Sequence, residues 1–358
     1  MVSVGEDNLR TRLFQIARKH PFYGSLRTDR HIYGRFDIAV RGMQNPRARP
    51  CFGVGFDDFK GKIFVVQSSV RPFASFKGYY STFFAKLQGF LDITVDNLKK
   101  YLYNLSMLYN YHTHTKRCKH AEGKDRKYVE QAIKAGLKTL GFSDHAPYLF
   151  PDTDYYSTYR MEVDELHEYA RSIRALKKEY EKDIEILCGF ELEYYPEFHE
   201  REMEFLNQVS PDYLIMGQHF IGNELSLLYA PRQSEDKMLE AYVSQVLEGL
   251  ATGHFLYLAH PDLPGFRFSK EAIQREYTRL CEGAKQMNIP LEINLLGIRE
   301  GRPYPNRKFF EIAAKIGNSV VLGIDAHDPQ SLRDTYAEQL AENMINDLGL
   351  NLIEEPLL

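Results

Sequence analysis

The sequence has few cysteines and no long apolar run, and each absence argues against a class of protein. Its four cysteines lie far apart and form no C-x-x-C pair: Cys51, Cys118, Cys188 and Cys281. This spacing argues against a disulfide framework or a structural zinc knot and favours a reducing compartment. No apolar run approaches the roughly 18–20 residues that cross a bilayer, and the first thirty residues lack the apolar stretch of a secretory signal. We therefore expect a cytoplasmic protein without a membrane span.

The chain is ordinary in composition but uneven in charge. Hydrophobic residues make up 44% and charged residues 26% of 358 residues, which is typical of a globular protein with room for one large α/β domain and an extra piece. The net charge is -4, yet residues 1–106 carry 17 Lys and Arg against 8 Asp and Glu. The remainder carries 28 basic and 41 acidic residues. A basic arm could bind an anionic partner such as nucleic acid, but we favour a different origin for the two segments.

From about residue 108 onward, short β-type runs alternate with helical patterns. The expected strands are Leu108–Tyr111, Thr139–Ser143, Ile184–Phe190, Tyr213–Gly217, Phe255–Ala259, Leu291–Asn294 and Ser319–Ile324. Most are continuous apolar runs, as in strands that are buried on both faces. Such alternation implies right-handed crossovers and a parallel sheet, and seven units predict a distorted TIM-like (β/α)7 barrel. An open doubly wound sheet is the alternative, but no Gly-rich phosphate loop follows the first strand.

Helical spacing of apolar residues fills the segments between these runs. The expected helices cover residues 128–137, residues 166–176, Glu197–Val209, Glu235–Ala251, Lys270–Met287 and Asn306–Ile316. Ser269 is the expected N-cap of the helix that begins at Lys270.

Residues 1–106 do not continue this alternation. Leu9–Ala17 could form a helix and Lys62–Val70 a strand, but no repeat or catalytic pattern follows. We expect an appended, partly disordered extension that catalysis does not require, ahead of a barrel at residues 107–358. The many Phe and Tyr residues between Phe52 and Tyr103 argue instead for a small accessory domain, because disordered chains are poor in aromatic residues.

Metal-capable side chains follow six of the seven expected strands. These candidate ligands are His112, His114, His120, His145, Glu191, His219, His260, Asp325 and His327. The carboxyl ends of parallel barrel strands converge on one face, where active sites of this architecture lie. Residues two apart on a strand project to the same side, so His112 and His114 can grip one ion together. We therefore expect a metal centre on this face.

The donor types indicate which ions the centre would hold. Imidazoles with a few carboxylates suit zinc, iron(II) or manganese better than magnesium or calcium. Nine candidate ligands are too many for one ion, so two or three ions are expected, with Glu191 as the bridging carboxylate. Asp144 and Asp262 could orient ligands or simply cap loops. Seven of the ten histidines after residue 106 lie at strand ends, whereas His167, His199 and His254 lie in or beside helices and are expected to be structural.

The motifs that carry these ligands resemble those of the polymerase-and-histidinol-phosphatase (PHP) superfamily. They run in order as Tyr111-His-Thr-His-Thr, Gly141-Phe-Ser-Asp-His145, Gly189-Phe-Glu191, Gln218-His219, Ala259-His-Pro-Asp262 and Gly323-Ile-Asp-Ala-His327. Glu191-Leu-Glu-Tyr194 and Leu296-Gly-Ile-Arg299 with Tyr304-Pro305 resemble the histidinol-phosphatase branch. The resemblance implies a distorted (β/α)7 barrel with a trinuclear metal centre. It also implies removal of phosphate from L-histidinol phosphate in histidine biosynthesis.

A phosphomonoester substrate needs cationic groups as well as metal ions. Arg160 and Arg299 are the expected phosphate ligands, because the guanidinium fork matches phosphate geometry. Glu191, Asp325 and His327 are the expected catalytic residues. The alternatives are another small-molecule phosphatase, a PHP-type phosphodiesterase or nuclease, and a related deaminase or amidase. No regular basic stripe supports nucleic-acid binding, and the Asp-x-His ending at Asp325 argues against the deaminases.

Overall fold

The computed structural model describes residues 107–150 and 153–358, together with the backbone of three strands nearer the amino terminus. By its contacts the chain divides into two compact units, Met1–Asn104 and Leu105–Leu358. In the first unit, β1 (Arg35–Ala39), β2 (Cys51–Asp57) and β3 (Lys62–Gln67) form an antiparallel sheet in the order β1-β2-β3.

This small sheet tests one sequence prediction for the first unit. The strand expected at Lys62–Val70 is confirmed as β3, which pairs with β2 through Val65 opposite Val54. The helix expected at Leu9–Ala17 and the expected partial disorder fall outside the described residues.

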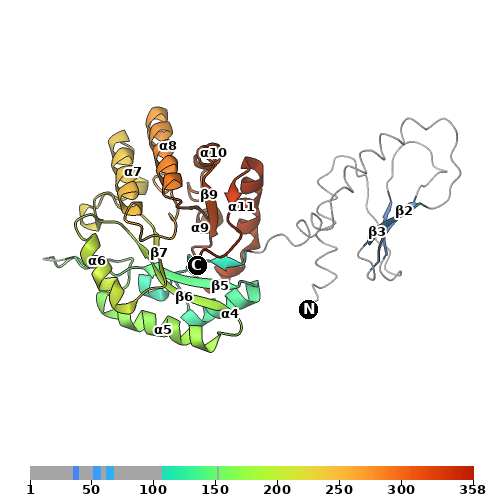
Figure 1. Ribbon diagram of the computed structural model, residues 1–358, viewed down its shortest axis with the longest axis horizontal. Coiled ribbons are helices and arrows are strands. Elements are labelled where there is room, and N and C mark those ends of the chain that lie inside the picture. The colour runs from blue at the N-terminus through green and yellow to red at the C-terminus, as the bar shows by residue number, and fades with distance from the viewer. Residues whose placement is uncertain (1–34, 40–50, 58–61, 68–106, 151–152) are drawn as a thin grey trace. The chain divides into compact units, whose positions relative to one another are not determined.

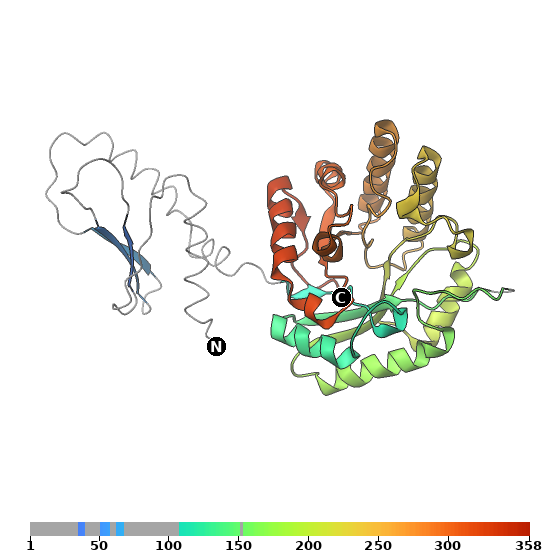
Figure 2. The same ribbon diagram turned by 180° about the vertical axis from the view of Figure 1, so that it is seen from behind.

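The second unit is built on a curled parallel sheet with helices around its outside (Figures 1 and 2). Its strands are β4 (Tyr109–Asn110), β5 (Thr139–His145), β6 (Glu185–Leu192), β7 (Tyr213–Met216), β8 (Leu291–Asn294), β9 (Ser319–Gly323) and β10 (Asn351–Leu352). They pair in the orders β4-β5-β6-β7 and β8-β9-β10. The register of β5 on β6 places His145 beside Glu191, which begins to assemble the site.

Single-residue bridges join the two runs of strands into a ring. Leu258 pairs with Met216 on one side and with Leu291 on the other, and Thr113 pairs with Ala326. The segment Phe255–Ala259 therefore occupies the place expected for the fifth strand, but the prediction of a regular strand there is wrong. The extended run stops at His260, whose φ of 30° is left-handed, and the next residue, Pro261, has no N–H to donate to a ladder.

Helices cover the outer face of the sheet. They are α4 (Asp125–Ala135), α5 (Leu166–Glu179), α6 (His199–Leu206), α7 (Asp236–Leu250), α8 (Lys270–Gln286), α9 (Leu295–Glu300), α10 (Arg307–Ile316) and α11 (Thr335–Leu348). All six expected helices are present, and the Ser269 side chain accepts from the Ala272 N–H at 3.1 Å, which confirms it as an N-cap. The sequence prediction missed α9 and α11.

The apolar residues form two clusters, one on each face of the sheet. The cluster inside the ring consists of Tyr111, Leu187, Tyr213, Ile215, Tyr257, Ala259 and Val321. The larger cluster fills the space between the sheet and the helices, with Phe142 and Phe190 as examples from β5 and β6. This double burial explains why the strands read as continuous apolar runs. Among the described residues, no helix is both long enough and apolar enough to cross a membrane.

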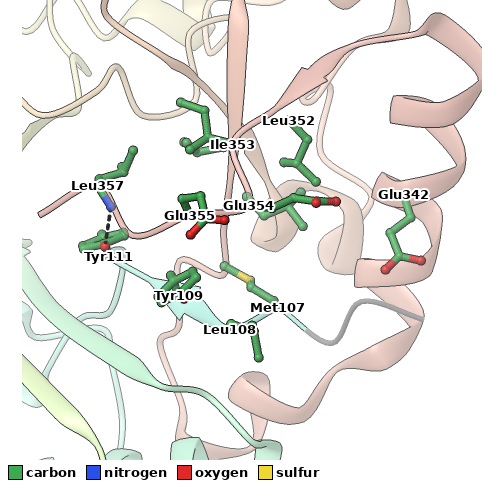
Figure 3. A pocket seen from close by; sticks show the side chains of 12 residues that line it. Met107, Leu108, Tyr109, Tyr111, Glu342, Leu352, Ile353, Glu354, Glu355 and Leu357 are labelled. Atoms are coloured by element: carbon green, nitrogen blue, oxygen red, sulfur yellow. Dashed lines mark hydrogen bonds between the residues drawn. The ribbon is translucent and has the colours of Figure 1, made fainter. Parts of the chain in front are cut away.

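The carboxyl-terminal tail covers the amino-terminal end of the barrel. Ile353 donates its N–H to the Val320 carbonyl at 2.9 Å, and the Leu357 N–H donates to the Tyr111 hydroxyl at the same distance. A small, mainly apolar pocket of about 70 Å³ lies between this tail and the start of β4 (Figure 3). None of the candidate ligands lines it, so it is separate from the expected metal centre.

One buried carboxyl in this unit gives a prediction for stability. Glu202 of α6 is buried, and burial raises its pKa to about 8 although the Leu149 N–H donates to it at 3.2 Å. A raised folded-state pKa means that the contribution to stability is fully present below the unfolded value near 4.5 and is lost as pH rises through about 8. We expect Glu202→Gln to remove this loss.

The free energy of unfolding of Glu202→Gln, relative to wild type, should increase with pH by up to about 1.4 kcal/mol per pH unit between the unfolded pKa near 4.5 and the folded pKa of about 8. Urea unfolding of the metal-free protein at pH 5 to 9 measures it, with the exposed Glu204→Gln on the same helix as the control. A difference between Glu202→Gln and wild type that stayed constant over this range would contradict the assignment.

Candidate metal centre

The structure brings the nine candidate ligands together at the carboxyl ends of the strands. Five groups, each of three ligand atoms within 4.8 Å of one another, are found among the described residues. Four of them consist of candidate ligands alone: His112–His260–Asp325, His112–His114–Glu191, His145–Glu191–His219 and His120–His145–His327. All nine residues belong to at least one of these four groups. That they bind metal stays a prediction.

Glu191 lies at the centre of the site and is 2% exposed. Five imidazoles surround its carboxylate at 2.9–3.8 Å: His112, His114, His145, His219 and His260. Burial alone would raise the pKa of Glu191, but the neighbouring imidazoles, His145 and His219 first, outweigh it and hold the pKa well below the usual range. The carboxylate therefore keeps its charge and can share its two oxygens between ions.

The end of β7 makes room for this carboxylate. A side chain at Gly217 would place its Cβ 1.7 Å from the Glu191 Oε1 atom. Position 217 therefore accepts only glycine while Glu191 keeps its place, because no Cβ can approach an oxygen so closely.

His112 and His114 face each other across a gap that suits a cation. Their Nε2 atoms are 3.1 Å apart, and both approach the Asp325 Oδ1 atom, at 3.5 and 3.1 Å. Burial disfavours a proton on His112, but Asp325, Glu292 and Glu191 outweigh it and raise its pKa to about 10. These carboxylates thus concentrate negative charge around the buried His112 ring. A bound divalent ion would displace the proton from this ring.

His120 and His327 present free ring nitrogens to the same face. Each donates its Nδ1–H to a backbone carbonyl, that of Cys118 at 2.7 Å and that of Asp325 at 3.2 Å, and so keeps a lone pair on Nε2. Burial and the nearby His327 and His114 lower the pKa of His120 to about 4, so it is neutral at physiological pH. The His327 Nε2 atom is buried without a hydrogen-bond partner among the described residues. Neutral imidazoles with free nitrogens fit metal ligation.

Backbone strain marks two of the ligands. His260 and Asp325 have φ values of 30° and 50°, in the left-handed region that few non-glycine residues adopt. Such strain costs about 1–3 kcal/mol and is typical of functional sites, where the surrounding fold holds it. Both residues directly follow the extended segments that deliver them.

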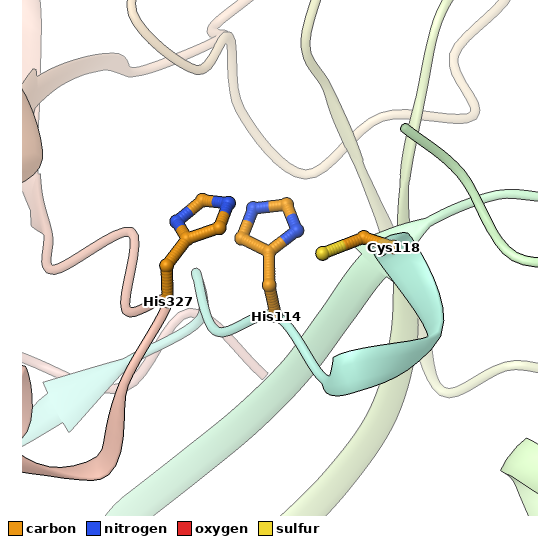
Figure 4. A group of neighbouring side chains, drawn as sticks. All are labelled: His114, Cys118 and His327. Atoms are coloured by element: carbon orange, nitrogen blue, oxygen red, sulfur yellow. The ribbon is translucent and has the colours of Figure 1, made fainter. Parts of the chain in front are cut away.

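Cys118 is a neighbour of the site that the sequence did not single out. Its thiol is buried and points toward the His114 ring, with His327 beyond (Figure 4). Burial, followed by the charge of Asp144, raises the pKa of this thiol. Because the thiolate is the metal-binding form, Cys118 is a poorer ligand than the imidazoles around it.

Buried carboxylates lie behind three of the imidazoles. His112 Nδ1 is 2.7 Å from Glu292, and His114 Nδ1 is 3.4 Å from Asp144. His219 Nδ1 is 3.4 Å from Glu193. The sequence suggested Asp144, included Glu193 in a motif of the resemblance without a role for it, and missed Glu292. A charged residue inside the apolar run Leu291–Asn294 was the available signal for Glu292, because an acid is rarely buried without a partner.

The two candidate phosphate ligands differ in surroundings. Arg160 is 1% exposed and donates to Glu224 at 2.8 Å and to Glu193 at 2.9 Å. Arg299, on α9, donates weakly to the backbone carbonyls of Ile324 and Asp325 at 3.4 Å. Its Nη1 atom has no hydrogen-bond partner among the described residues and is 3.8 Å from Asp334. Both roles stay predictions, and Arg299 keeps one donor, Nη1, that makes no hydrogen bond in the described part of the chain.

The sequence did not single out a third arginine near the metal centre. Arg302 donates to the Tyr304 hydroxyl at 2.7 Å, and the Tyr304 ring lies 5.9 Å from that of His260. The histidines that were expected to be structural lie elsewhere: His167 is exposed on α5, and His199 and His254 contact each other at 3.0 Å.

Fold and site together define the class of protein: a curled parallel α/β barrel with a candidate metal centre at the carboxyl ends of its strands. The chain belongs to the PHP domain family, whose model matches residues 110–295.

Relatives and solved structures agree with this family. A protein of Deinococcus radiodurans named "Probable histidinol-phosphatase" is 29% identical over 66% of this chain and 92% of its own length. The Bacillus subtilis histidinol-phosphatase is 26% identical over 63% of this chain and 95% of its own length. The fold is similar to a histidinol phosphate phosphatase of Lactococcus lactis, solved with zinc, L-histidinol and phosphate. That similarity has a TM-score of 0.54 at 20% identity and covers 69% of this chain and 95% of the other.

Proposed function

We propose that this chain is a metal-dependent histidinol-phosphatase, which hydrolyses L-histidinol phosphate to L-histidinol and phosphate in histidine biosynthesis. The observation that carries the proposal is the buried Glu191 carboxylate with five imidazoles around it, at the carboxyl ends of the strands. The named relatives in Deinococcus and Bacillus and the ligands of the Lactococcus structure support the choice of substrate.

The residues present fit two or three divalent ions, with zinc, manganese or iron as the candidates. The fit rests on facing ring nitrogens, on the buried charge of Glu191 and on Asp325 Oδ1 and His327 Nε2, which are buried and make no hydrogen bond in the described part of the chain. His112, His260 and Asp325 would hold one ion, and His120, His145 and His327 another, while Glu191 groups with His112 and His114 and with His145 and His219. When bound, such ions polarise phosphoryl oxygens and acidify water.

The protein's own groups bind and orient the reacting parts in this proposal. Asp325 keeps its negative charge, because burial raises its pKa but His112, His114 and His327 lower it further, to well below the usual range. It can therefore accept a hydrogen bond from the attacking water and orient it. Arg299 binds a phosphoryl oxygen through Nη1, a charge-assisted contact that neutralises charge on the phosphoryl group, while the alcohol of histidinol is the leaving group.

A second charged cluster suits the cationic end of the substrate. Glu193 and Glu224 are buried, and in the described part of the chain they share the guanidinium of Arg160. Burial raises the pKa of Glu193, but His219 and then Arg160 outweigh it and lower the pKa, so Glu193 is charged. The charged Glu193 carboxylate lies 3.4 Å from His219 Nδ1, where it would favour an amine or imidazolium.

Hydrolysis of a phosphoester panel tests the function. The full chain, loaded in turn with zinc, manganese or iron(II), is given histidinol phosphate, serine phosphate, a sugar phosphate and a dinucleotide phosphodiester. We expect histidinol phosphate to have the highest kcat/KM by at least about tenfold. Preference for another monoester would reject the substrate, and preference for the dinucleotide would favour a phosphodiesterase instead.

We also propose that residues 107–358 carry the activity and that residues 1–106 are not required for it. The nine candidate ligands, both core clusters and the curled sheet come from the second compact unit. A chain that begins at Met107 should bind metal and turn over substrate within about twofold of the full chain, as expected when no contact of the site is lost. Aggregation or loss of turnover would show that the first unit covers apolar barrel surface.

The free, buried cysteines Cys118, Cys188 and Cys281 support a cytoplasmic location.

A further inference from the structure

Glu292 is a fully buried acid on β8 whose two oxygens contact the metal centre from behind. Its Oε1 atom is 2.7 Å from His112 Nδ1. Its Oε2 atom accepts the His260 backbone N–H and the Asn294 side-chain amide, each at 2.9 Å. The same Asn294 amide nitrogen donates to Asp325 Oδ2 at 3.0 Å. One carboxylate therefore reaches, directly or through one amide, three candidate ligands that come from three other segments.

These three ligands form one group of their own. His112, His260 and Asp325 have ligand atoms within 4.8 Å of one another. We call this group the inner subsite and the group of His120, His145 and His327 the outer subsite. No contact described above joins Glu292 to the outer subsite, where His120 and His327 are instead oriented by the carbonyls of Cys118 and Asp325.

The neighbouring strand leaves space for this acid. A side chain at Gly323 of β9 would place its Cβ 1.7 Å from Glu292 Oε1. Tyr257 adds a hydroxyl that donates to the same oxygen at 3.4 Å. The carboxylate is thus surrounded by donors and confined to one position, which is the condition for holding another group in place.

We propose that Glu292 is a positioning residue that holds the inner subsite in its ligand geometry. The Glu292 Oε1 atom accepts the Nδ1–H of His112, so the lone pair of that ring stays on Nε2, the atom that faces His114 and Asp325. The inference rests on the metal centre of the proposed function. It goes further because it predicts that Glu292 affects the binding of the ion in the inner subsite and not the binding of the other ions.

Glutamine at position 292 tests this assignment through the tautomer of His112. The amide oxygen is needed at the Oε2 position, where two N–H groups donate. The amide NH₂ then faces His112 Nδ1 as a donor, so the neutral ring must carry its proton on Nε2. A protonated Nε2 cannot bind an ion. The substitution keeps the size of the side chain at position 292 but moves the proton of His112 from Nδ1 to Nε2.

The experiment titrates zinc-loaded full chain with a competing chromophoric chelator and counts zinc per chain. We expect Glu292→Gln to lose one ion at 10- to 100-fold lower chelator than wild type and to keep the other or others at wild-type affinity. The cobalt-loaded variant should also lose part of the visible absorption, which reports coordination geometry. Glu276→Gln is the matched control, since Glu276 is also buried but pairs with Arg275 and Arg279 on α8.

A second variant guards against a folding defect at position 292. Gly323→Ala keeps the carboxylate but pushes it from its place, and it should cause the same selective loss. Wild-type zinc affinity in both variants, or simultaneous loss of every ion from both while thermal unfolding is unchanged, would overturn the inference. Absence of zinc from wild type would instead reject the metal centre itself.

Discussion

Glu191→Ala is expected to strip the bound metal and to lower phosphatase turnover by on the order of a thousandfold, because we propose its carboxylate as the shared ligand of the site. Two of the four groups of candidate ligands include Glu191, and five imidazoles lie within 3.8 Å of it. Without that charge the imidazoles lose their central anion and ions lose a bridging ligand. Metal content by plasma mass spectrometry and turnover of histidinol phosphate measure the effect.

Other variants separate the site from general damage to the fold. His112→Ala and Asp325→Ala should act in the same direction, since both residues belong to the inner subsite. His167→Ala, at an exposed position on α5, should leave metal content and turnover unchanged. If Glu191→Ala kept both metal and turnover near wild type, Glu191 would not be a ligand.

Arg299→Ala is expected to raise KM by about 30-fold while metal content stays at the wild-type level. Losing a charge-assisted contact to phosphate costs on the order of 2 kcal/mol, which corresponds to that factor. Arg299 makes two weak bonds to backbone carbonyls at 3.4 Å and a long ion pair with Asp334 at 3.8 Å, so its loss should disturb the fold little. Steady-state kinetics with histidinol phosphate and a parallel metal assay measure the change.

The matched control is Arg307→Ala on α10, an arginine that pairs with Glu311 and Asp347. Its kinetics should not change. Unaltered KM in Arg299→Ala would exclude this guanidinium from the phosphate site, and Arg302, next to Tyr304, would be the residue to examine next.

The gathering of the candidate ligands on one face could be predicted because it depends on local sequence and one general rule. Most of these residues follow a run of apolar residues that forms a strand or a bridge, whereas His120 follows the 3-10 helix Lys116–Cys118, and parallel strands in a barrel bring their carboxyl ends to one face. His145 and Glu191 illustrate this, since they come from different motifs and lie opposite each other in the register of β5 and β6. Helix ranges followed from spacing and capping for the same local reason, as at Ser269.

Two elements that depend on their surroundings were mispredicted or missed. Phe255–Ala259 has an apolar run like its neighbours, but the left-handed His260 and the following Pro261 restrict it to a bridge at Leu258. The two residues of β10 gain their extended form only from pairing with Ser319 and Val320, far away in sequence. A strand of two residues has no periodicity to detect.

The sequence by itself determined the class of chemistry, because histidine and carboxylate at successive strand ends specify metal donors whatever the details of packing. Only the tertiary structure decided which groups stand behind those donors. Glu292 meets His112 across 180 positions of sequence, and Arg160 meets Glu224 across 64. Such partners are set by strand register and by the space that residues such as Gly323 leave, and neither produces a local pattern. The physical reason is that ligand type is a property of one residue, whereas ligand orientation is a property of the packed interior around it.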